Sequence, residues 1–249
     1  MSNPVLRGAN LTRRWGGIVA LRNVSIDLHR GEIHAVIGTN GAGKSTLINV
    51  LSGEVAASSG SVELANTDVT RWAQPRRARA GLGRSYQHST IFPQFTVHEN
   101  CRLAAQARHQ HPWRWWAAAG DCDASNELAR SALERAGLSG ADGRGAESLS
   151  YGEKRQLEIA MCLATDPSVL LLDEPLAGMG AEEGEQMLSL LSGLRENHAI
   201  LLVEHDMDAV FRIADRITVL VDGAVIASDI PQAVRDNRDV QNAYLGGAA

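Results

Sequence analysis

Lysine is nearly missing from this chain of 249 residues. Only Lys44 and Lys154 occur among the 24 basic residues, and the other twenty-two are arginines. Cysteine is also sparse, with Cys101, Cys122 and Cys162 scattered at spacings that do not suit a metal site. An odd and scattered set of thiols is typical of a reducing compartment rather than of a disulfide framework.

Long apolar runs are lacking as well. Residues 1–14 contain no apolar signal core, and no stretch approaches the roughly 20 residues needed to span a bilayer. The net charge of −5 gives no reason to expect a nucleic-acid partner. We therefore expect a soluble cytoplasmic protein that reaches any membrane through a partner. Its length allows a substantial core in one or two domains.

One of the two lysines lies in the most informative stretch. Residues 33–37 are apolar and β-branched and predict a buried strand, and residues 46–51 predict the start of a helix. Between them stands the phosphate-binding pattern of Gly, four residues, Gly-Lys, and Ser or Thr, in Gly38, Thr39, Asn40, Gly41, Ala42, Gly43, Lys44, Ser45 and Thr46. The glycines let successive N–H groups face phosphate oxygens, and the helix N-terminus adds positive charge. We expect Lys44 to reach the β- and γ-phosphates and Ser45 to hold Mg²⁺.

A second buried strand ends in acids. Residues 169–172 are continuously apolar, which is typical of a strand inside a parallel sheet, and Asp173 and Glu174 follow. Ligands of open α/β sheets bind at this end of the strands. Asp173 is predicted to hold Mg²⁺ through water and Glu174 to face an attacking water. The strand at 200–203 brings His205 to the same edge, where it can donate to a γ-phosphate.

Four other features have competing interpretations. Ser150 and Glu153 form a capping box, which a plain helix start explains fully. Trp15 precedes two glycines and either stacks on a flat base or belongs to the core. The basic segment 75–79 favours a solvated helix face over a binding patch. The paired histidines in 109–116 lack accompanying ligands, so they do not predict a metal site.

The remaining pattern is simpler. Residues 96–167 look helical, and acids follow Gly180 at the start of another helix, where they match its dipole. Asp222-Gly223 predicts a hairpin turn. The tail from Pro231 is predicted to be one helix that ends at Leu245.

Taken in order, these motifs resemble those of the ATP-binding subunits of ABC transporters over essentially the whole chain. Residues 38–46 are similar to the Walker A loop and residues 169–174 to Walker B. Residues 149–153 resemble the ABC signature, Gln87 the Q-loop glutamine, and His205 the switch histidine. Trp15 matches the adenine-stacking aromatic. The resemblance implies an α/β phosphate-loop NTPase fold, with a parallel-sheet core, an N-terminal antiparallel β subdomain and a helical subdomain. It implies one domain, 1–249, in which 1–95 and 168–249 form the core and β subdomain and 96–167 the helical subdomain.

The resemblance also implies a mechanism. Two copies, or this chain and a sister ATPase, pack head to tail with ATP between them. Each nucleotide lies on one subunit's phosphate loop and is covered by the other's Ser150, Tyr151, Gly152 and Glu153. Glu174 polarises the attacking water, and Gln87 contacts Mg²⁺. The stabilising charge comes from Mg²⁺, Lys44, Ser150 and His205. Closure on ATP drives transmembrane permease subunits, which a periplasmic solute-binding protein supplies. The ATPase is peripheral on the inner face of the membrane.

Within the superfamily, the signature, the residues after Glu174 and the segment around His205 look like those of importers of branched-chain amino acids, or of urea and amides. Departures exist: Thr39 replaces the usual proline or serine, and residues 177–180 lack the usual D-loop aspartate. Two alternatives are the lipopolysaccharide-export ATPase and a non-transport ABC protein. The first usually has Leu-Pro-Gln where this chain has Ser85-Tyr86-Gln87. The second needs coiled coils or paired cassettes, for which this chain has no room.

Overall fold

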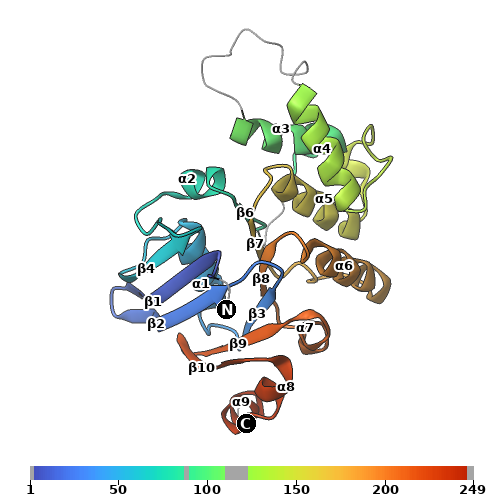
Figure 1. Cartoon of the computed structure of the whole chain (residues 1–249). Coiled ribbons are helices and arrows are strands. Elements are labelled where there is room, and N and C mark those ends of the chain that lie inside the picture. Colours follow the sequence, from blue (N-terminus) through green and yellow to red (C-terminus); the bar gives the residue numbers. More distant parts are fainter. Residues whose placement is uncertain (1–2, 87–89, 110–122, 246–249) are drawn as a thin grey trace.

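The computed structural model describes residues 3–86, 90–109 and 123–245. A six-stranded sheet in the order β10-β9-β3-β8-β7-β6 forms its centre (Figure 1). Five of these strands run parallel: β9 (Arg216–Val221), β3 (Ile33–Gly38), β8 (Ala199–Val203), β7 (Val169–Asp173) and β6 (Leu82–Arg84). The edge strand β10 (Ala224–Asp229) is antiparallel to β9. Its turn, Asp222-Gly223, has two positive φ angles, as the hairpin prediction requires.

An antiparallel sheet in the order β2-β1-β4-β5 lies beside it. Its strands are β1 (Leu6–Trp15), β2 (Ile18–Leu28), β4 (Ser59–Leu64) and β5 (Thr67–Asp68). Helix α1 (Lys44–Ser52) packs between the two sheets and contacts β2, β3 and β7 (Figure 1). The predicted mixture of an antiparallel subdomain with a parallel core is confirmed.

The central strands are buried on both faces. In β7, Val169 and Leu171 belong to the core shared with α1 and the antiparallel sheet. Leu170 and Leu172 belong instead to the core shared with the helices of the other face. Because successive side chains of a strand point to opposite faces, a strand covered on both sides needs an unbroken apolar run.

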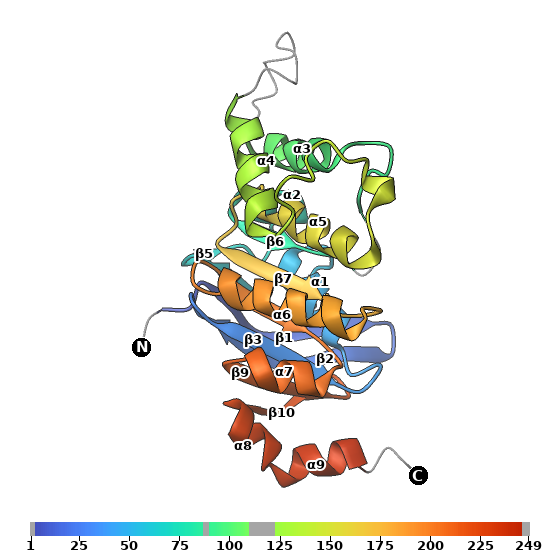
Figure 2. The ribbon, with the colours of Figure 1, turned by 90° about the vertical axis from the view of Figure 1, so that its right-hand side faces the viewer.

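Helices occupy the segment that the sequence predicts to be helical. α3 (Val97–His109), α4 (Asp123–Arg135) and α5 (Tyr151–Leu163) pack against one another (Figure 2). α6 (Ala181–Leu194) and α7 (Met207–Ile213) cover the outer face of the parallel sheet (Figures 1 and 2). Within residues 3–86, 90–109 and 123–245, no helix has the length and apolar character needed to cross a membrane.

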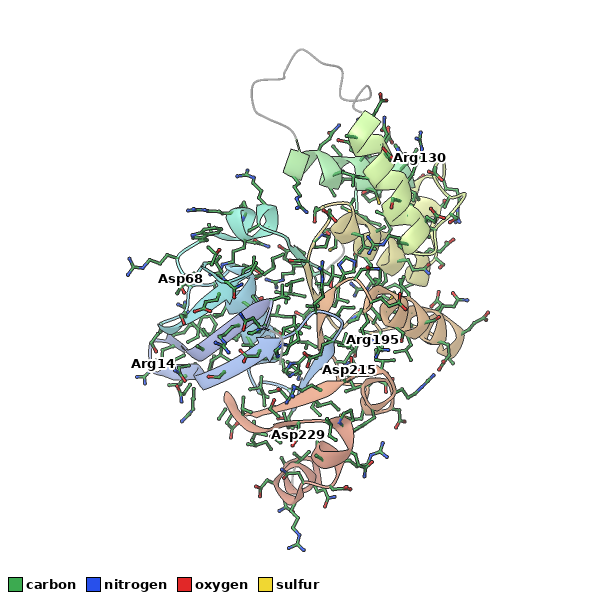
Figure 3. The ribbon with its side chains drawn as sticks, viewed as in Figure 1. Arg14, Asp68, Arg130, Arg195, Asp215 and Asp229 are labelled. Carbon is green, nitrogen blue, oxygen red and sulfur yellow. The ribbon has the colours of Figure 1, made fainter. Side chains whose placement is uncertain are left out.

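The amino-terminal end of β3 is tied to α6 through a side-chain bridge. Asp215 accepts a hydrogen bond from the Ile33 amide at 2.9 Å and pairs with Arg195 at 3.0 Å. Figure 3 shows Arg195 and Asp215 side by side below α6. The tie fixes the start of the strand whose other end carries the phosphate loop.

The predicted single C-terminal helix is wrong. Two helices are present, α8 (Pro231–Arg235) and α9 (Arg238–Leu245). The Asn237 side chain accepts hydrogen bonds from the amides of Asp239 and Val240, at 2.8 and 3.3 Å. Asparagine is a strong N-cap residue, so it begins a new helix instead of continuing the first.

The basic segment is only partly the solvated face that was predicted. In α2 (Gln74–Arg79), Arg76 and Arg79 are exposed, but Arg77 is only 2% exposed. Its guanidinium donates to four main-chain carbonyls, of Val50, Leu51, Thr70 and Trp72, at 2.7–3.1 Å. A helix that packs on α1 presents one position inward, and here that position holds an arginine with its donors satisfied.

Candidate active site

The predicted site residues meet at one edge of the parallel sheet. β8 lies between β3 and β7, and Val203 near its end pairs with Val36 on one side and Asp173 on the other. The phosphate loop follows β3, the acids follow β7, and His205 follows β8. The sheet order therefore brings three segments that are far apart in sequence to one place, at the carboxyl ends of the strands.

The phosphate loop depends on two glycines that cannot be replaced by larger residues. A Cβ atom at Gly38 would lie 2.3 Å from the Leu220 carbonyl oxygen, and one at Gly43 would lie 2.6 Å from that of Ala20. Gly43 is also left-handed, with φ of 103°, where it begins α1. Among the described residues no side chain caps this helix, so its first N–H groups remain available to an anion.

Lys44 lies over its own loop. Its ammonium donates to the carbonyl oxygens of Gly38 at 2.6 Å and Thr39 at 3.1 Å, and the residue is 6% exposed. Desolvation lowers the pKa of Lys44, while the charges of Glu174 and Asp173 act in the opposite direction. The Lys44 ammonium is therefore held within reach of the charges of Asp173 and Glu174. Ser45, the predicted Mg²⁺ ligand, is exposed at the start of α1.

The two acids after β7 have different surroundings. Asp173 is buried, its amide donates to the Ser85 hydroxyl at 3.3 Å, and burial raises the pKa of its carboxyl. Arg84 and Lys44 oppose that rise. Glu174 is half-buried and left-handed, with φ of 50°, and its amide donates to Val203 at 2.9 Å. A non-glycine residue with this backbone angle is uncommon, and among the described residues six others share it.

His205 reaches the same edge. Its Nδ1 lies 4.0 Å from Glu174 Oε1, and its side chain is 60% exposed. The carboxylate of Glu204 is fully buried beneath it and accepts hydrogen bonds from the amides of His205 at 3.2 Å and Leu176 at 2.8 Å. Burial raises the pKa of Glu204, and these two hydrogen bonds oppose the rise. Glu204 thereby fastens the loop after Glu174 to the loop that carries the histidine.

The signature segment begins α5, away from the phosphate loop. Ser150 Oγ accepts from the Glu153 amide at 3.2 Å, and Glu153 accepts in return from the Ser150 amide at 2.8 Å, which confirms the predicted capping box. Arg144 donates to both Glu153 carboxylate oxygens, and together with Ser150 it lowers the pKa of that carboxyl. Tyr151 is 46% exposed and Gly152 is buried.

Trp15 is not a core residue. It lies at the end of β1, is 44% exposed, and the Arg13 guanidinium lies 4.6 Å from its ring centroid. The core interpretation of this tryptophan is therefore wrong, and a ring open to solvent remains able to stack on a base. Gln87 and residues 110–116 lie outside the described residues.

Two acids were given no site role by sequence reasoning. Glu204 gave no signal of its own, because an acid after a strand is usually solvated. Glu183 was expected only to match the dipole of α6, yet it contacts Ser150 and Gly152. Its partners lie 31 and 33 residues earlier in the chain, which no local pattern reveals.

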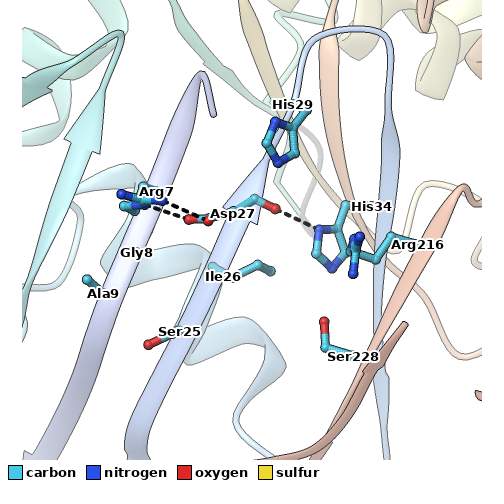
Figure 4. A pocket seen from close by; sticks show the side chains of 10 residues that line it. All are labelled: Arg7, Gly8, Ala9, Ser25, Ile26, Asp27, His29, His34, Arg216 and Ser228. Carbon is cyan, nitrogen blue, oxygen red and sulfur yellow. Dashed lines mark hydrogen bonds and ion pairs between the residues drawn. The ribbon is translucent and has the colours of Figure 1, made fainter. Parts of the chain in front are cut away.

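A separate cavity of about 460 Å³ lies at the opposite end of the sheet (Figure 4). Its charges are already matched, because Arg7 pairs with Asp27 and Arg216 with Glu32. His34 is bonded on both ring nitrogens, and burial lowers its pKa to about 4. It is far along the strands from the phosphate loop, and its groups are satisfied within the protein.

The fold and the cluster at the sheet edge define a phosphate-loop nucleotide-binding ATPase. Comparison with known families is more specific: the family described as ABC transporter matches residues 21–177, and the chain belongs to that family. A second family, described as branched-chain amino acid ATP-binding cassette transporter, matches residues 224–249.

Similar proteins cover the whole chain, and similar solved structures cover nine tenths of it or more. It is 40% identical to the high-affinity branched-chain amino acid transport ATP-binding protein LivG of Salmonella typhimurium, and 37% identical to BraF, of the same description, from Pseudomonas aeruginosa. Both alignments span 100% of either chain. Among solved structures, the ADP conformation of an ATP-binding cassette of an ABC transporter matches with a TM-score of 0.87 and 29% identity, over 98% of this chain and 100% of that one. A dimeric post-hydrolysis cassette bound to ADP and Pi matches with a TM-score of 0.76 and 25% identity, over 91% and 98%.

Proposed function

We propose that this chain is the ATP-hydrolysing subunit of an importer for branched-chain amino acids. The observation that carries the proposal is the full-length similarity to LivG and BraF, at 40% and 37% identity, joined to the match of residues 224–249 to the branched-chain amino acid family. The whole chain, 1–249, then serves as one ATP-binding domain, with residues 96–167 as its helical subdomain.

In this proposal ATP lies on the phosphate loop, with the β- and γ-phosphates on the N–H groups of residues 38–46 and on Lys44. The adenine stacks on Trp15, which is open to solvent. Ser45, Asp173 and Gln87 would hold Mg²⁺, and a hydroxyl and a carboxylate are hard oxygen ligands that suit it. Mg²⁺ would neutralise charge on the phosphates.

Glu174 is the proposed general base. Its carboxylate polarises the attacking water, and Nδ1 of His205, 4.0 Å away, places the imidazole where it can donate to the γ-phosphate. Glu204 is a positioning residue in this scheme, because it holds the amides on both sides of the pair. Lys44 leaves its loop carbonyls when phosphate oxygens replace them as partners.

The site is completed by a second ATPase, packed head to tail. Ser150 and Gly152 at the start of its α5 donate to the γ-phosphate, with Tyr151 and Glu153 in the same segment. A dimeric cassette with ADP and Pi among the similar structures supports this arrangement. The second subunit is another copy of this chain or a sister ATPase.

The partners in the membrane are permease subunits, and a periplasmic solute-binding protein delivers the solute to them. A groove of about 200 Å³ beside Tyr86 supports a docking place near Gln87 and residues 96–116. Buried Glu158 lines it, and its Oε1 has no hydrogen-bond partner within the part of the chain that the structure describes. A buried unpaired oxygen favours a partner segment that brings a donor. The ATPase is thereby held at the inner face of the cell membrane.

The test is Glu174→Gln. Loss of a general base should lower ATP turnover by about a thousandfold, while ATP still binds and traps a dimer. Turnover is measured by phosphate release and the dimer by size-exclusion chromatography with and without ATP. Glu182→Gln, an exposed acid on α6, is the matched control and should behave as the wild type. A Glu174→Gln protein that still hydrolyses ATP, or that stays monomeric with ATP bound, would contradict the proposal.

Solute class is tested separately. The ATPase is reconstituted in liposomes with its permease subunits and binding protein, and leucine, urea and acetamide are compared as stimulants of ATP hydrolysis. Stimulation by leucine alone is expected. Stimulation by urea or acetamide would assign the amide-importer alternative instead.

A further inference from the structure

The anion site at the start of α5 already holds a carboxylate of the same chain. Glu183 Oε1 lies 3.2 Å from the Gly152 amide nitrogen and 3.4 Å from Ser150 Oγ, each of which donates to it. The other oxygen, Oε2, accepts from the Gly180 amide at 3.4 Å, where α6 begins. One side chain therefore joins the N-termini of two helices.

Glu183 accepts from two donors of the signature segment, the Ser150 hydroxyl and the Gly152 amide, that the capping box of α5 does not use. The Glu153 amide is satisfied by Ser150 Oγ, and the Ser150 amide by Glu153. The remaining Ser150 hydroxyl proton and the Gly152 amide both point to Glu183. A Cβ atom at Gly152 would lie 2.7–3.1 Å from three atoms of the Glu183 side chain, so the glycine makes room for this carboxylate.

We propose that Glu183 is a built-in competitor for the γ-phosphate at the signature segment and sets the ATP concentration at which the dimer closes. The inference rests on the proposed function, in which the same hydroxyl and amide donate to the γ-phosphate of the opposite subunit. A carboxylate and a phosphate oxygen cannot share these donors, because both are anionic and the donors have one proton each. Closure therefore requires Glu183 to leave, and its negative charge opposes the approach of the nucleotide.

The competition also gives α6 a role in signalling. Glu183 lies nine residues beyond Glu174, in the first turn of α6. When the γ-phosphate displaces it, its Oε1 loses the contact that joins α6 to α5. Binding of the γ-phosphate at the signature segment of one subunit would thus change the contacts of α6, which follows the loop after Glu174 in that same subunit.

The experiment uses the Glu174→Gln background, in which closed dimers accumulate, and compares Glu183→Gln with Glu182→Gln. Glutamine keeps the shape, and its side-chain oxygen can still accept from the Gly180 amide, but it removes the charge. Glu182 is exposed in the same turn, so its change is matched in charge and in distance from the helix end. Dimer formation is followed by analytical ultracentrifugation across an ATP titration, and thermal unfolding verifies that both variants are folded.

Glu183→Gln should lower the ATP concentration at half-maximal dimerisation by about threefold to tenfold, the range expected for one charge at a helix terminus. Glu182→Gln should leave it unchanged, and both variants should bind ATP as monomers equally well by calorimetry. If the Glu174→Gln background dimerises but Glu183→Gln leaves the ATP midpoint unchanged or raises it, Glu183 is not a competitor, and the proposed closed dimer still stands. A background that binds ATP and never dimerises would instead overturn the proposed closed dimer.

Discussion

Two helices of this protein begin at the proposed anion sites, and they are stabilised at opposite ends. α1 begins at Gly43, without a side-chain cap among the described residues and without an acid in its first turn. α5 begins at Ser150, with a complete capping box that includes Glu153. The last turn of α1 is fastened by Arg77, which donates to the carbonyls of Val50 and Leu51.

The difference has a physical reason. A helix that keeps its first N–H groups for a ligand cannot use a cap there, so it has to be stabilised by burial and by its C-terminal carbonyls. The start of α5 is occupied by carboxylates of its own chain, so it is stable without ligand and a ligand has to displace one of them. Under the proposed function, the phosphate loop binds its anion directly, whereas the signature segment must first release a carboxylate.

The largest effect should come from unfastening α1. Arg77→Met removes the guanidinium donor from four main-chain carbonyls, two of them in the buried last turn of α1. It should lower the free energy of unfolding by about 3–4 kcal/mol, or roughly 10 °C in melting temperature. Calorimetry measures the loss, and hydrogen exchange should show it in α1 before α5. Exposed Arg79→Met is the control from the same helix. If hydrogen exchange in Arg77→Met increases equally in α1 and α5, Arg77 does not stabilise α1 specifically, and the proposed difference between the two helices is wrong. Should Arg77→Met fail to fold, Arg77→Lys, which keeps the charge, should show a smaller loss in the same direction.

The next effect concerns affinity. Lys44→Ala removes the ammonium now bonded to the loop carbonyls, and we expect about 3 kcal/mol of binding free energy, or about a hundredfold in ATP affinity, to be lost. Isothermal titration calorimetry measures it. Lys154→Ala removes the one other lysine, on α5, and should bind ATP normally. Unaltered affinity in Lys44→Ala would show that the loop is not the phosphate site.

A smaller effect is expected at the adenine. Trp15→Ala should weaken ATP binding by about 1–2 kcal/mol, the usual worth of one base stacked on an aromatic ring. Trp15→Phe should restore most of the affinity, because a flat ring is kept. GTP and ATP should lose affinity alike, since stacking reads no base edge. Equal affinity in wild type and Trp15→Ala would leave the ring without a role at the nucleotide.

The sequence predicted those parts of the fold in which local pattern and tertiary role agree. The runs ending at Ile37 and Leu172 had to be buried strands, because both faces of the sheet are covered. The Ser150 capping box and the Asp222-Gly223 hairpin are local rules that the tertiary structure obeys. Each motif follows a predicted parallel strand, and the carboxyl ends of parallel strands lie at one edge of the sheet. The sequence therefore predicted that the candidate site lies at this edge.

Three features that the sequence analysis did not predict depend on hydrogen bonds made by single polar side chains. Arg77 has the composition of a solvated face, and only the packing of α2 on α1 buries it. Asn237 interrupts a helical pattern by turning its side chain to later amides. Glu183 meets residues more than thirty positions away. Arg77 and Glu183 bond partners that the fold brings near, whereas Asn237 caps a helix locally, and hydrophobic periodicity registers none of these polar contacts.

The smallest expected effect is on stability, at the capped start of α5. Glu153→Gln keeps a capping side chain but removes the charge beside Arg144 and the helix N-terminus, at a cost of about 0.5 kcal/mol, or roughly 1–2 °C. The pKa of Glu153 is lowered in the folded protein, first by Arg144 and then by the Ser150 amide. Its contribution is therefore present above the ordinary pKa of a glutamate and is lost as the pH falls toward the folded value.

The difference in melting temperature between wild type and Glu153→Gln should thus be measurable at pH 7 and shrink as the buffer is taken below about pH 4.5. Glu147→Gln, an exposed acid on the preceding 3₁₀ turn, should show no such difference at either pH. A difference that persists at acid pH would mean that the amide exchange disturbs the cap itself rather than its charge. The start of α5 would then be stabilised by hydrogen-bond geometry and not by the negative charge of Glu153. The two helix starts would in that case differ in their hydrogen bonds, and not in the charge that stabilises them.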